Sequence, residues 1–463
     1  MSTQRHVIKR QVIELTVQDT AQAQPLQDEV SRIYRQRLIP LIDQYLSEIS
    51  TPDKLYRIDS LELNLGALDL QHFEEDFVEK VSHSLRREVA AQISSLEHAN
   101  VAVRESPATT SHLELFAIFM RTGHLPWWAD ASNPHLMAEN LNALLHDSPK
   151  AFKPLLQVIA QEPHMRQRLV NQYTDEQLTD LTGLLVPAYQ ISIASTYHAL
   201  LHMLQKTEAV SGWQKFQVRR SLWNNLLLVA SLGGQEYTLQ DFYLAVFKRM
   251  ATELGITNKT FVAEMQQAVA NENTFVSTST EKNANQPETR TASNFSEADE
   301  IYITNAGLVI LWPFLQNFFD YLNLLEARQF KDRTAQHRAV GLLQVLATRE
   351  AVSPEYLLPL NKVLCGLAVE EVFDFGAPLL ETEAEECERL LEAVIAQAPI
   401  LHDMTANGFR GSFLLRPGML SLRDGLWLLQ VEKETYDVVL ERFPWRWEWI
   451  KLPWMDVPLR VDW

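Results

Sequence analysis

Two histidines have the spacing of a possible metal site. His198 and His202 lie four residues apart in a segment with helical patterning, so both imidazoles could face one metal ion. The residues between them, Ala199-Leu200-Leu201, lack the glutamate that HExxH proteases use as a general base, and no third ligand is evident nearby. We therefore predict ordinary histidines on a helix surface and no bound metal.

An acidic cluster could in principle supply paired carboxylates for acid–base catalysis. Its spacing relative to Leu390, Leu391 and Val394 is helical, which predicts a single solvated helix face. The cluster consists of Glu381, Glu383, Glu385, Glu386 and Glu388.

Other catalytic motifs are missing from the sequence. There is no GxxxxGK[ST] phosphate loop and no GxGxxG fingerprint, and Ser412 in GFRGS lacks the spacing of a nucleophile elbow. The two cysteines, Cys365 and Cys387, form no CxxC pair. These observations predict a non-catalytic protein without a cofactor. A hydrolase remains as an alternative if the fold brings His198 or His202 to a third ligand.

Composition limits the class of protein. The 463 residues carry a formal net charge of -18 and are 46% hydrophobic, which predicts folded cores and argues against nucleic-acid binding. The cysteine usage and the absence of a secretory h-region favour a cytoplasmic location, with incorporation into a larger particle left open. The apolar stretch from 306 to 325 contains Pro313, Asn317 and Asp320, so we expect a buried helix there and no membrane span.

Hydrophobic periodicity predicts a predominantly helical α+β fold. Residues 1–100 form a β-α-β-α module, with strands at 7–17 and 56–66 and a helix after each. A helical array covers 101–270, and the polar stretch 271–300 is a flexible linker. A helical domain follows at 301–405, and a tryptophan-rich strand module at 406–463 ends the chain.

The C-terminal module has the clearest local signals. Asp424-Gly425 between two apolar runs predicts a hairpin, and 432–441 predicts a short helix. Alternation at 445–449 and 457–463 predicts two more strands. Because isolated hairpins are marginally stable, we expect the N-terminal strands and these C-terminal strands to share one sheet. Six of the eleven tryptophans lie between Trp427 and Trp463, and three of them would share one strand face.

Seven segments together resemble the contractile injection system tape measure family of phage-tail-like particles. They cover roughly the first 130 residues and everything after about 300, with a looser match between. The segments are HVIKRQVIEL (6–15), RIDSLELNLG (57–66), RTGHLPWW (121–128), AGLVILWPFL (306–315), LPLNKVLCG (358–366), FRGSFLLRPG (409–418) and IKLPWM (450–455).

The resemblance implies a tail-assembly protein that helps to set tube length and has no catalytic residues or cofactor. It implies tail-tube, baseplate-hub or terminator proteins as partners, and further copies of the chain. Aromatic surface is enriched at interfaces, so we predict a partner surface from the tryptophan block and the family-like motifs. Its residues are Trp127, Trp128, Arg410, Trp445, Trp447, Trp449 and Trp454.

Two modes of action remain open. A fully helical chain would span about 690 Å, whereas a compact one would have a radius of gyration of about 23 Å. The twenty prolines and the strand modules favour compact parts. The chain is therefore either an extended ruler whose length varies within 131–300, or a compact assembly factor. An assembly chaperone or adaptor for tail subunits is the alternative.

Overall fold

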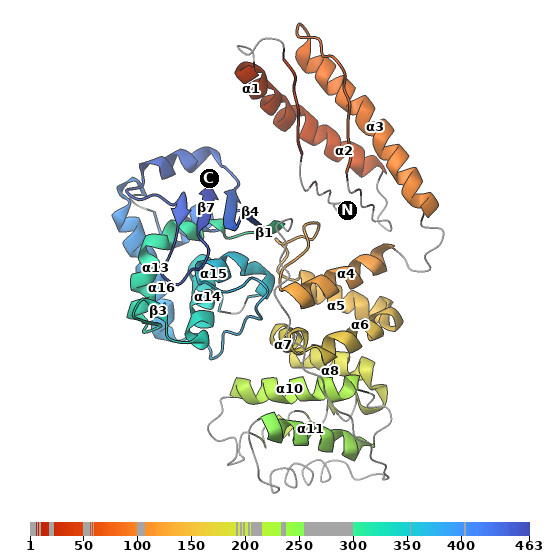
Figure 1. Ribbon diagram of the computed structural model, residues 1–463, viewed down its shortest axis with the longest axis vertical. Coiled ribbons are helices and arrows are strands. Elements are labelled where there is room, and N and C mark those ends of the chain that lie inside the picture. Colours follow the sequence, from red (N-terminus) through yellow and green to blue (C-terminus); the bar gives the residue numbers. More distant parts are fainter. Residues whose placement is uncertain are drawn as a thin grey trace. The chain divides into compact units, whose positions relative to one another are not determined.

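The computed structural model describes two compact units, one within residues 1–112 and the other from Leu113 to Trp463 (Figure 1). The described residues are 6, 8, 11–17, 23–49, 56, 58, 60–99, 107–190, six positions between 193 and 204, 215–232, 238–253, 300–351, 353–401 and 404–463. Of the predicted linker 271–300 only Glu300 is described, and it begins a strand. The rest of the linker, His198 and His202 lie outside the described residues.

The first unit is built on two long helical stretches. Helix α1 (Ala23–Ile33), the π-helix η2 (Tyr34–Leu38) and α2 (Ile39–Ile49) follow one another without a break, and α3 (Phe73–Ala99) is the second stretch. Apolar residues at helical spacing form their shared core. That core contains Val30, Ile33, Leu38, Ile42, Tyr45, Phe73, Phe77, Val81, Leu85 and Val89.

Two extended segments accompany these helices. In the second, Leu61, Leu63 and Leu65 are half-buried against the helical core, while Glu62 and Asn64 are exposed. The predicted alternation of 56–66 is therefore seen in its described residues. Those of 7–17 are also extended but mostly exposed.

The prediction of one sheet shared by both ends of the chain is wrong for the residues described. The five-stranded sheet contains only strands from residue 300 onward. The described parts of 7–17 and 56–66 pair with no strand and are not assigned as strands. Leu61, Leu63 and Leu65 pack on the helices, so their apolar face is covered without the segment pairing with another strand.

The second unit begins with a helical array, as predicted for this region. Proline starts several helices, where its missing N–H costs no hydrogen bond, and Thr174 forms a capping box with Gln177 ahead of α8. The array comprises α4 (Pro107–Thr122), α5 (Leu136–Asp147), α6 (Pro149–Gln161), α7 (Pro163–Gln172), α8 (Asp175–Leu185), η4 (Pro187–Tyr189), α10 (Lys215–Ser231) and α11 (Leu239–Glu253).

The remainder of this unit, residues 300–463, is called the sheet half here. Helices surround a small sheet, and one buried core draws on both 301–405 and 406–463. Its helical elements are η6 (Ala306–Leu311), α13 (Trp312–Tyr321), α14 (Arg333–Thr348), η7 (Glu355–Leu357), α15 (Pro359–Leu364), α16 (Glu381–Gln397), η8 (Pro399–Leu401), α17 (Ala406–Phe409), the π-helix η9 (Arg410–Leu414) and η10 (Thr435–Arg442). The predicted helix at 432–441 is thus a 3-10 helix.

The sheet has the strand order β1-β4-β5-β7-β6. Its strands are β1 (Glu300–Ile303), β4 (Gly418–Arg423), β5 (Leu426–Val431), β6 (Trp449–Ile450) and β7 (Leu459–Asp462); β2 (Leu325–Glu326) and β3 (Gln329–Phe330) form a separate pair. The predicted hairpin is confirmed, because β4 and β5 pair around Asp424 and Gly425, whose φ angles of 51° and 72° fit a type I′ turn. Strand β7 runs parallel to β5 and antiparallel to β6.

The apolar stretch from 306 to 325 is packed inside the sheet half. All residues of η6 are buried, and α13 adds Leu315, Phe318 and Phe319 to the same core. Within the described part of the chain, no helix has the length and hydrophobicity to cross a bilayer.

Candidate functional site

Three buried charged side chains meet where the helical array contacts the sheet half. Glu355 of η7 accepts a hydrogen bond from Arg168 Nε of α7 at 3.0 Å and another from Lys362 Nζ of α15 at 2.7 Å. Arg168 and Glu355 are fully buried, and Lys362 is 1% exposed. We call Arg168, Glu355 and Lys362 the buried charge cluster. Buried charges of this kind are tolerated only when they are paired and hydrogen-bonded.

The two cations also bind a loop, residues 369–375, that has no regular structure. The carbonyls of Val369 and Glu371 accept from Lys362 Nζ at 2.8 and 2.7 Å, and that of Glu370 accepts from Arg168. Buried carbonyls outside helices and sheets need such donors. The cluster therefore fixes this loop as well as the contact between the two halves.

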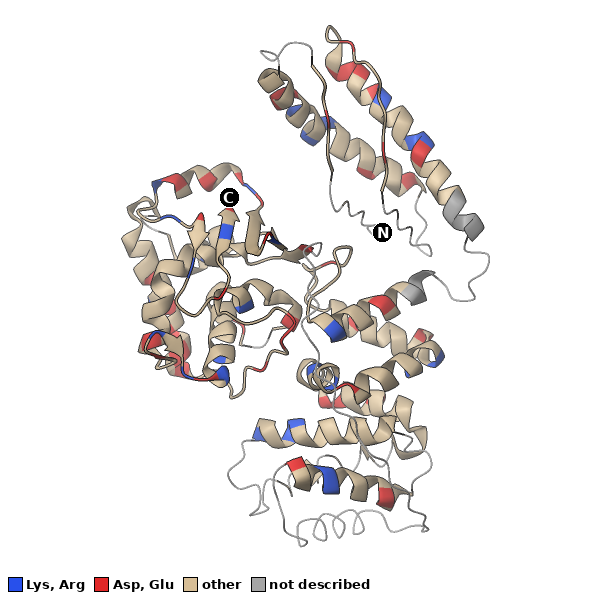
Figure 2. Cartoon of the chain, viewed as in Figure 1, with Lys and Arg blue, Asp and Glu red and all other residues tan. Residues whose placement is uncertain are grey.

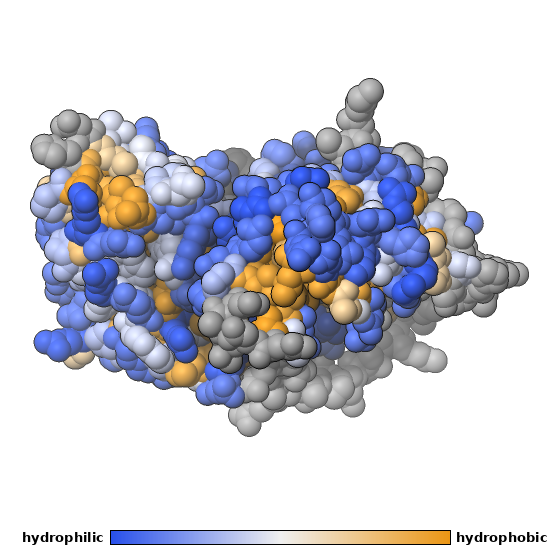
Figure 3. Space-filling view, turned by 90° about the horizontal axis from the view of Figure 1, so that it is seen from above, coloured by the Kyte–Doolittle hydropathy of each residue, from blue (hydrophilic) through white to orange (hydrophobic). Residues whose placement is uncertain are grey.

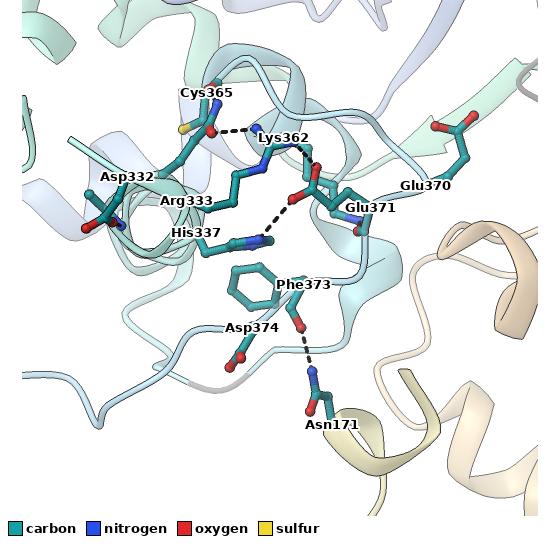
Figure 4. Close-up of polar contacts among 12 residues, drawn as sticks. Asn171, Asp332, Arg333, His337, Lys362, Cys365, Glu370, Glu371, Phe373 and Asp374 are labelled. Carbon is teal, nitrogen blue, oxygen red and sulfur yellow. Dashed lines mark hydrogen bonds and ion pairs between the residues drawn. The ribbon is translucent and has the colours of Figure 1, made fainter. Parts of the chain in front are cut away.

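Side chains of the array complete the junction. Asn171 Nδ2 donates to the Phe373 carbonyl at 3.0 Å (Figure 4). Arg220 forms an ion pair with Asp374. Gln172 Oε1 accepts from the backbone N–H of Glu355 at 3.0 Å. Helices α7 and α10 thus both hold segments of the sheet half.

A lysine this deeply buried could be a nucleophile if its amine were neutral. Burial lowers the pKa of Lys362, and the adjacent Glu355 carboxylate opposes that shift. Nζ has three oxygen acceptors at 2.7–2.8 Å, which is the full complement of an ammonium group. This arrangement holds a charged lysine in place and presents no amine to a substrate.

The pair formed by His337 and Glu371 has the outline of an acid–base dyad. His337 Nε2 lies 3.1 Å from Glu371 Oε1. Burial of Glu371 works to raise its pKa, but the His337 contact and the charge of Arg333 prevail and lower it. No described serine, threonine or cysteine hydrogen-bonds to His337, and its ring packs near Phe373. Without a neighbouring nucleophile the pair has no evident chemistry.

Neither cysteine is disposed to react. Both are buried, and burial raises the pKa of Cys365 well above its usual value and that of Cys387 to about 12. A thiolate is the reactive form of cysteine, so these two side chains act as apolar core residues.

The glycine of RTGHLPWW lies directly against the buried charge cluster. Gly123 has a φ of +77°, and a Cβ there would be 2.6 Å from Glu355 Oε1 and 2.9 Å from Arg168 Nη2. Only glycine accommodates both the backbone angle and the contact. RTGHLPWW contains Gly123, and LPLNKVLCG contains Lys362 of the same cluster. Two segments that carry the family resemblance therefore meet at the buried charge cluster.

The later motifs are fitted together in the same way. A Cβ on Gly307 would lie 1.6 Å from the carbonyl oxygen of Phe413, which joins AGLVILWPFL to FRGSFLLRPG. A Cβ on Gly366 would lie 2.3 Å from the carbonyl oxygen of Trp454, which joins LPLNKVLCG to IKLPWM. These close approaches give the motifs a packing role.

Most of the predicted partner surface lies inside the sheet half. Trp447 and Trp454 are buried and Trp445 is half-buried; the indole N–H of Trp445 donates to Ile310 O at 3.0 Å, and that of Trp454 to Leu364 O at 2.8 Å. Trp449, at 57% exposure, is the clear exception. Residues 445–448 form no strand, so the predicted single face of three tryptophans is wrong.

The other predicted surface residues are also partly or wholly covered. Arg410 is 4% exposed and donates to Leu346 O at 2.8 Å and to both carboxylate oxygens of Glu388. Trp127 and Trp128 are half-buried. A partner role for these positions stays a prediction, with Trp449 as its most accessible member.

The surface offers few other candidates. Charges of both signs are interleaved along the helices (Figure 2), and apolar side chains gather in separate patches on a largely hydrophilic face (Figure 3). Among the residues that the structure describes, no three histidines, cysteines or acids are grouped to hold a metal ion. The buried charge cluster had no signal in the sequence, because Arg168 is 187 positions from Glu355 in the chain.

Comparison with known proteins gives one result. A family model described as contractile injection system tape measure protein matches residues 5–463. No curated protein and no solved structure matches the chain.

Proposed function

Because the chain belongs to the contractile injection system tape measure protein family, we propose that it sets the length of a contractile tail tube during assembly without catalysing a reaction. The observation that carries this proposal is the match over residues 5–463, which spans both compact units. Within the described residues, the groups with catalytic outlines are buried or half-buried and are held in structural contacts, which supports the non-catalytic part of the proposal.

The fold favours different roles for the folded unit and for the chain between 254 and 299. The buried charge cluster and the close-packed motif glycines hold Leu113–Trp463 as one folded unit. Unfolding it to serve as a strand inside a tube would cost its whole stability, on the order of 5–15 kcal/mol. We therefore propose that this unit acts while folded, as a docking end, and that the chain between 254 and 299, which leaves this unit after Glu253 and re-enters it at Glu300, contributes the variable length.

A series of insertions tests the proposal. Both ends of 271–299 lead into the same folded unit, so an insert of 20 residues must run out and back. It would lengthen a ruler by at most about 15 Å if the insert were helical and about 33 Å if it were extended. Tail length would be measured by electron microscopy on particles assembled with each variant. The matched control places the same insert at the exposed Asp424-Gly425 turn, where no change in length is expected.

A tail length that stays constant across the linker series would overturn the length-setting role. Analysis of the same particles also separates the alternative, an assembly chaperone or adaptor. A chaperone would co-purify with tail-tube, baseplate-hub or terminator proteins before assembly and be missing from finished tails. A tape measure would affect the length of every particle that incorporates it.

A further inference from the structure

The second unit contains two separate hydrophobic cores, one in the helical array and one in the sheet half. Among the described residues, the core of the sheet half includes no side chain from the array. The core of the array includes only Tyr356 and Leu357 from the sheet half. Burial of apolar surface is the main stabilising contribution in a folded protein. Each half therefore has its own source of stability.

The contact between the two halves is mainly polar. The array holds the sheet half through the Arg168–Glu355 ion pair and through hydrogen bonds to backbone groups of residues 355, 370 and 373. Arg220 and Asp374 add a second ion pair, in which each side chain is 27% exposed. When such groups separate, water replaces the partners that they lose, so hydration offsets part of the lost interaction. Contacts of this composition are typical of domains that move relative to one another.

Tyr356 is the side chain of the sheet half that is buried in the core of the array. It is 1% exposed, its ring centroid lies 5.9 Å from that of Phe119, and its hydroxyl donates to Asn133 O at 2.8 Å. Leu357, which follows it, is half-buried. Separation of the halves would expose these two side chains and leave the rest of both cores covered. Because the cost of exposure rises with apolar area, separation costs less than unfolding either half.

We infer that the second unit opens at this contact, so that the array and the sheet half separate as two folded bodies before either of them unfolds. Residues 254–299 join α11 to β1 and keep the separated halves covalently connected. In the closed state both ends of this segment belong to one body, whereas in the open state it connects two. The opening is a property of the fold and does not depend on the length-setting role.

A urea titration of the full-length chain tests the order of events. Separation is followed by energy transfer between fluorophores attached to Asn142→Cys in α5 and Asn317→Cys in α13, which are exposed positions in the two halves. Unfolding of each half is followed by pulsed thiol labelling and mass spectrometry in a second protein, Ala160→Cys. The native Cys365 and Cys387 lie in the core of the sheet half, and Ala160 lies in that of the array.

We expect the energy transfer to fall at a lower urea concentration than the one at which any of these three core cysteines becomes labelled. The buried native thiols do not take up the fluorophores in the folded protein, so they leave the energy-transfer measurement undisturbed. A fall in energy transfer that coincides with labelling of the core of either half would overturn the inference, because the halves would then separate only by unfolding.

Tyr356→Ala tests the inference at the contact itself. The substitution leaves a cavity in the array only in the closed state, so it should raise the equilibrium constant for opening by about 100-fold or more. Energy transfer should then fall at a lower urea concentration, while labelling of the three core cysteines keeps its wild-type midpoints. Labelling that shifts together with the energy transfer would overturn the inference.

Leu391→Ala is the matched control. Leu391 is fully buried in α16 and belongs to the core of the sheet half. Its truncation should shift labelling of Cys365 and Cys387 to lower urea and leave the fall in energy transfer where it is in the wild type. An equal shift of both measurements in this variant would show that the contact and the core of the sheet half break together, against the inference.

Discussion

Arg168 and Glu355 form a fully buried ion pair, with Arg168 Nε 3.0 Å from Glu355 Oε2, although the two residues are 187 positions apart in the sequence. Arg168 belongs to the helical array and Glu355 to the sheet half. Tyr356, next to Glu355, lies in the core of the array and donates from its hydroxyl to Asn133 O at 2.8 Å. The pair thus lies at the contact between the helical array and the sheet half of the second unit.

Replacing Glu355 by Gln should destabilise the second unit by about 3–5 kcal/mol, because Arg168 and Lys362 would remain buried without a counter-charge. Urea denaturation followed by tryptophan fluorescence measures the change in the free energy of unfolding. Glu385→Gln is the control, since its ion pair with Arg389 is exposed and should contribute less than about 1 kcal/mol. Equal effects of the two substitutions would show that the cluster contributes no special stability.

Gly123→Ala should destabilise the protein more than Gly425→Ala. Both glycines have a φ above +70°, so each substitution carries a similar backbone penalty of about 1 kcal/mol. At Gly425 a Cβ meets nothing within 4 Å, whereas at Gly123 it would be 2.6 Å from Glu355 Oε1. The excess for Gly123→Ala should be about 1–3 kcal/mol in the same denaturation assay. A difference close to zero would mean that the cluster shifts freely to admit a methyl group.

The elements that sequence patterns predicted well are those with local causes. The hairpin at Asp424-Gly425 was predictable because two consecutive residues with positive φ select that turn chemistry. The array was predictable because Pro149, Pro163 and Pro187 mark the starts of helical segments. The alternation of Leu61, Leu63 and Leu65 correctly predicted which side chains face inward.

The structural features that could not be predicted from the sequence depend on contacts between residues far apart in the chain. Alternation at Trp445, Trp447 and Trp449 suggested one strand face, but Trp445 and Trp447 turn inward to pack on Phe443. The buried charge cluster joins residues from α7, η7 and α15, and no local spacing encodes that meeting. The N-terminal strands were predicted from alternation alone, which fixes side-chain direction and leaves the pairing partner undetermined.

The ion pair between Arg416 and Asp437 should make the free energy of unfolding depend on pH. Burial of Asp437 works to raise its pKa, but Arg416, the backbone N–H of Glu434 and the indole of Trp463 all donate to this carboxylate and together lower it. A carboxyl whose pKa is lower in the folded state stabilises that state above its unfolded pKa of about 3.9. This contribution is lost as the pH falls below about 4 and through the folded pKa.

Asp437→Asn isolates that contribution. At pH 7 the variant should be about 2 kcal/mol less stable than the wild type, and the difference should shrink as the pH falls below 4. Urea titrations between pH 2.5 and 7 measure it. Asp462→Asn, at an exposed position in β7, should show a small effect with little change across that range. A constant difference for Asp437→Asn at all pH values would rule out a role for its ionisation.

The tryptophan block can be divided experimentally into core and candidate partner surface. Trp454 packs against Phe319 and Phe330 and is 6% exposed, so Trp454→Ala should cost about 3–5 kcal/mol. Trp449 is 57% exposed, with Arg460 6.0 Å from its ring centroid, so Trp449→Ala should change stability by less than about 1 kcal/mol.

If Trp449 contacts a tail protein, its loss should weaken that complex about tenfold or more while the fold stays intact. Co-purification with tail-tube and baseplate proteins, quantified beside the unfolding curves, measures both effects. Unchanged recovery of every tail protein with Trp449→Ala would remove this residue from the partner surface.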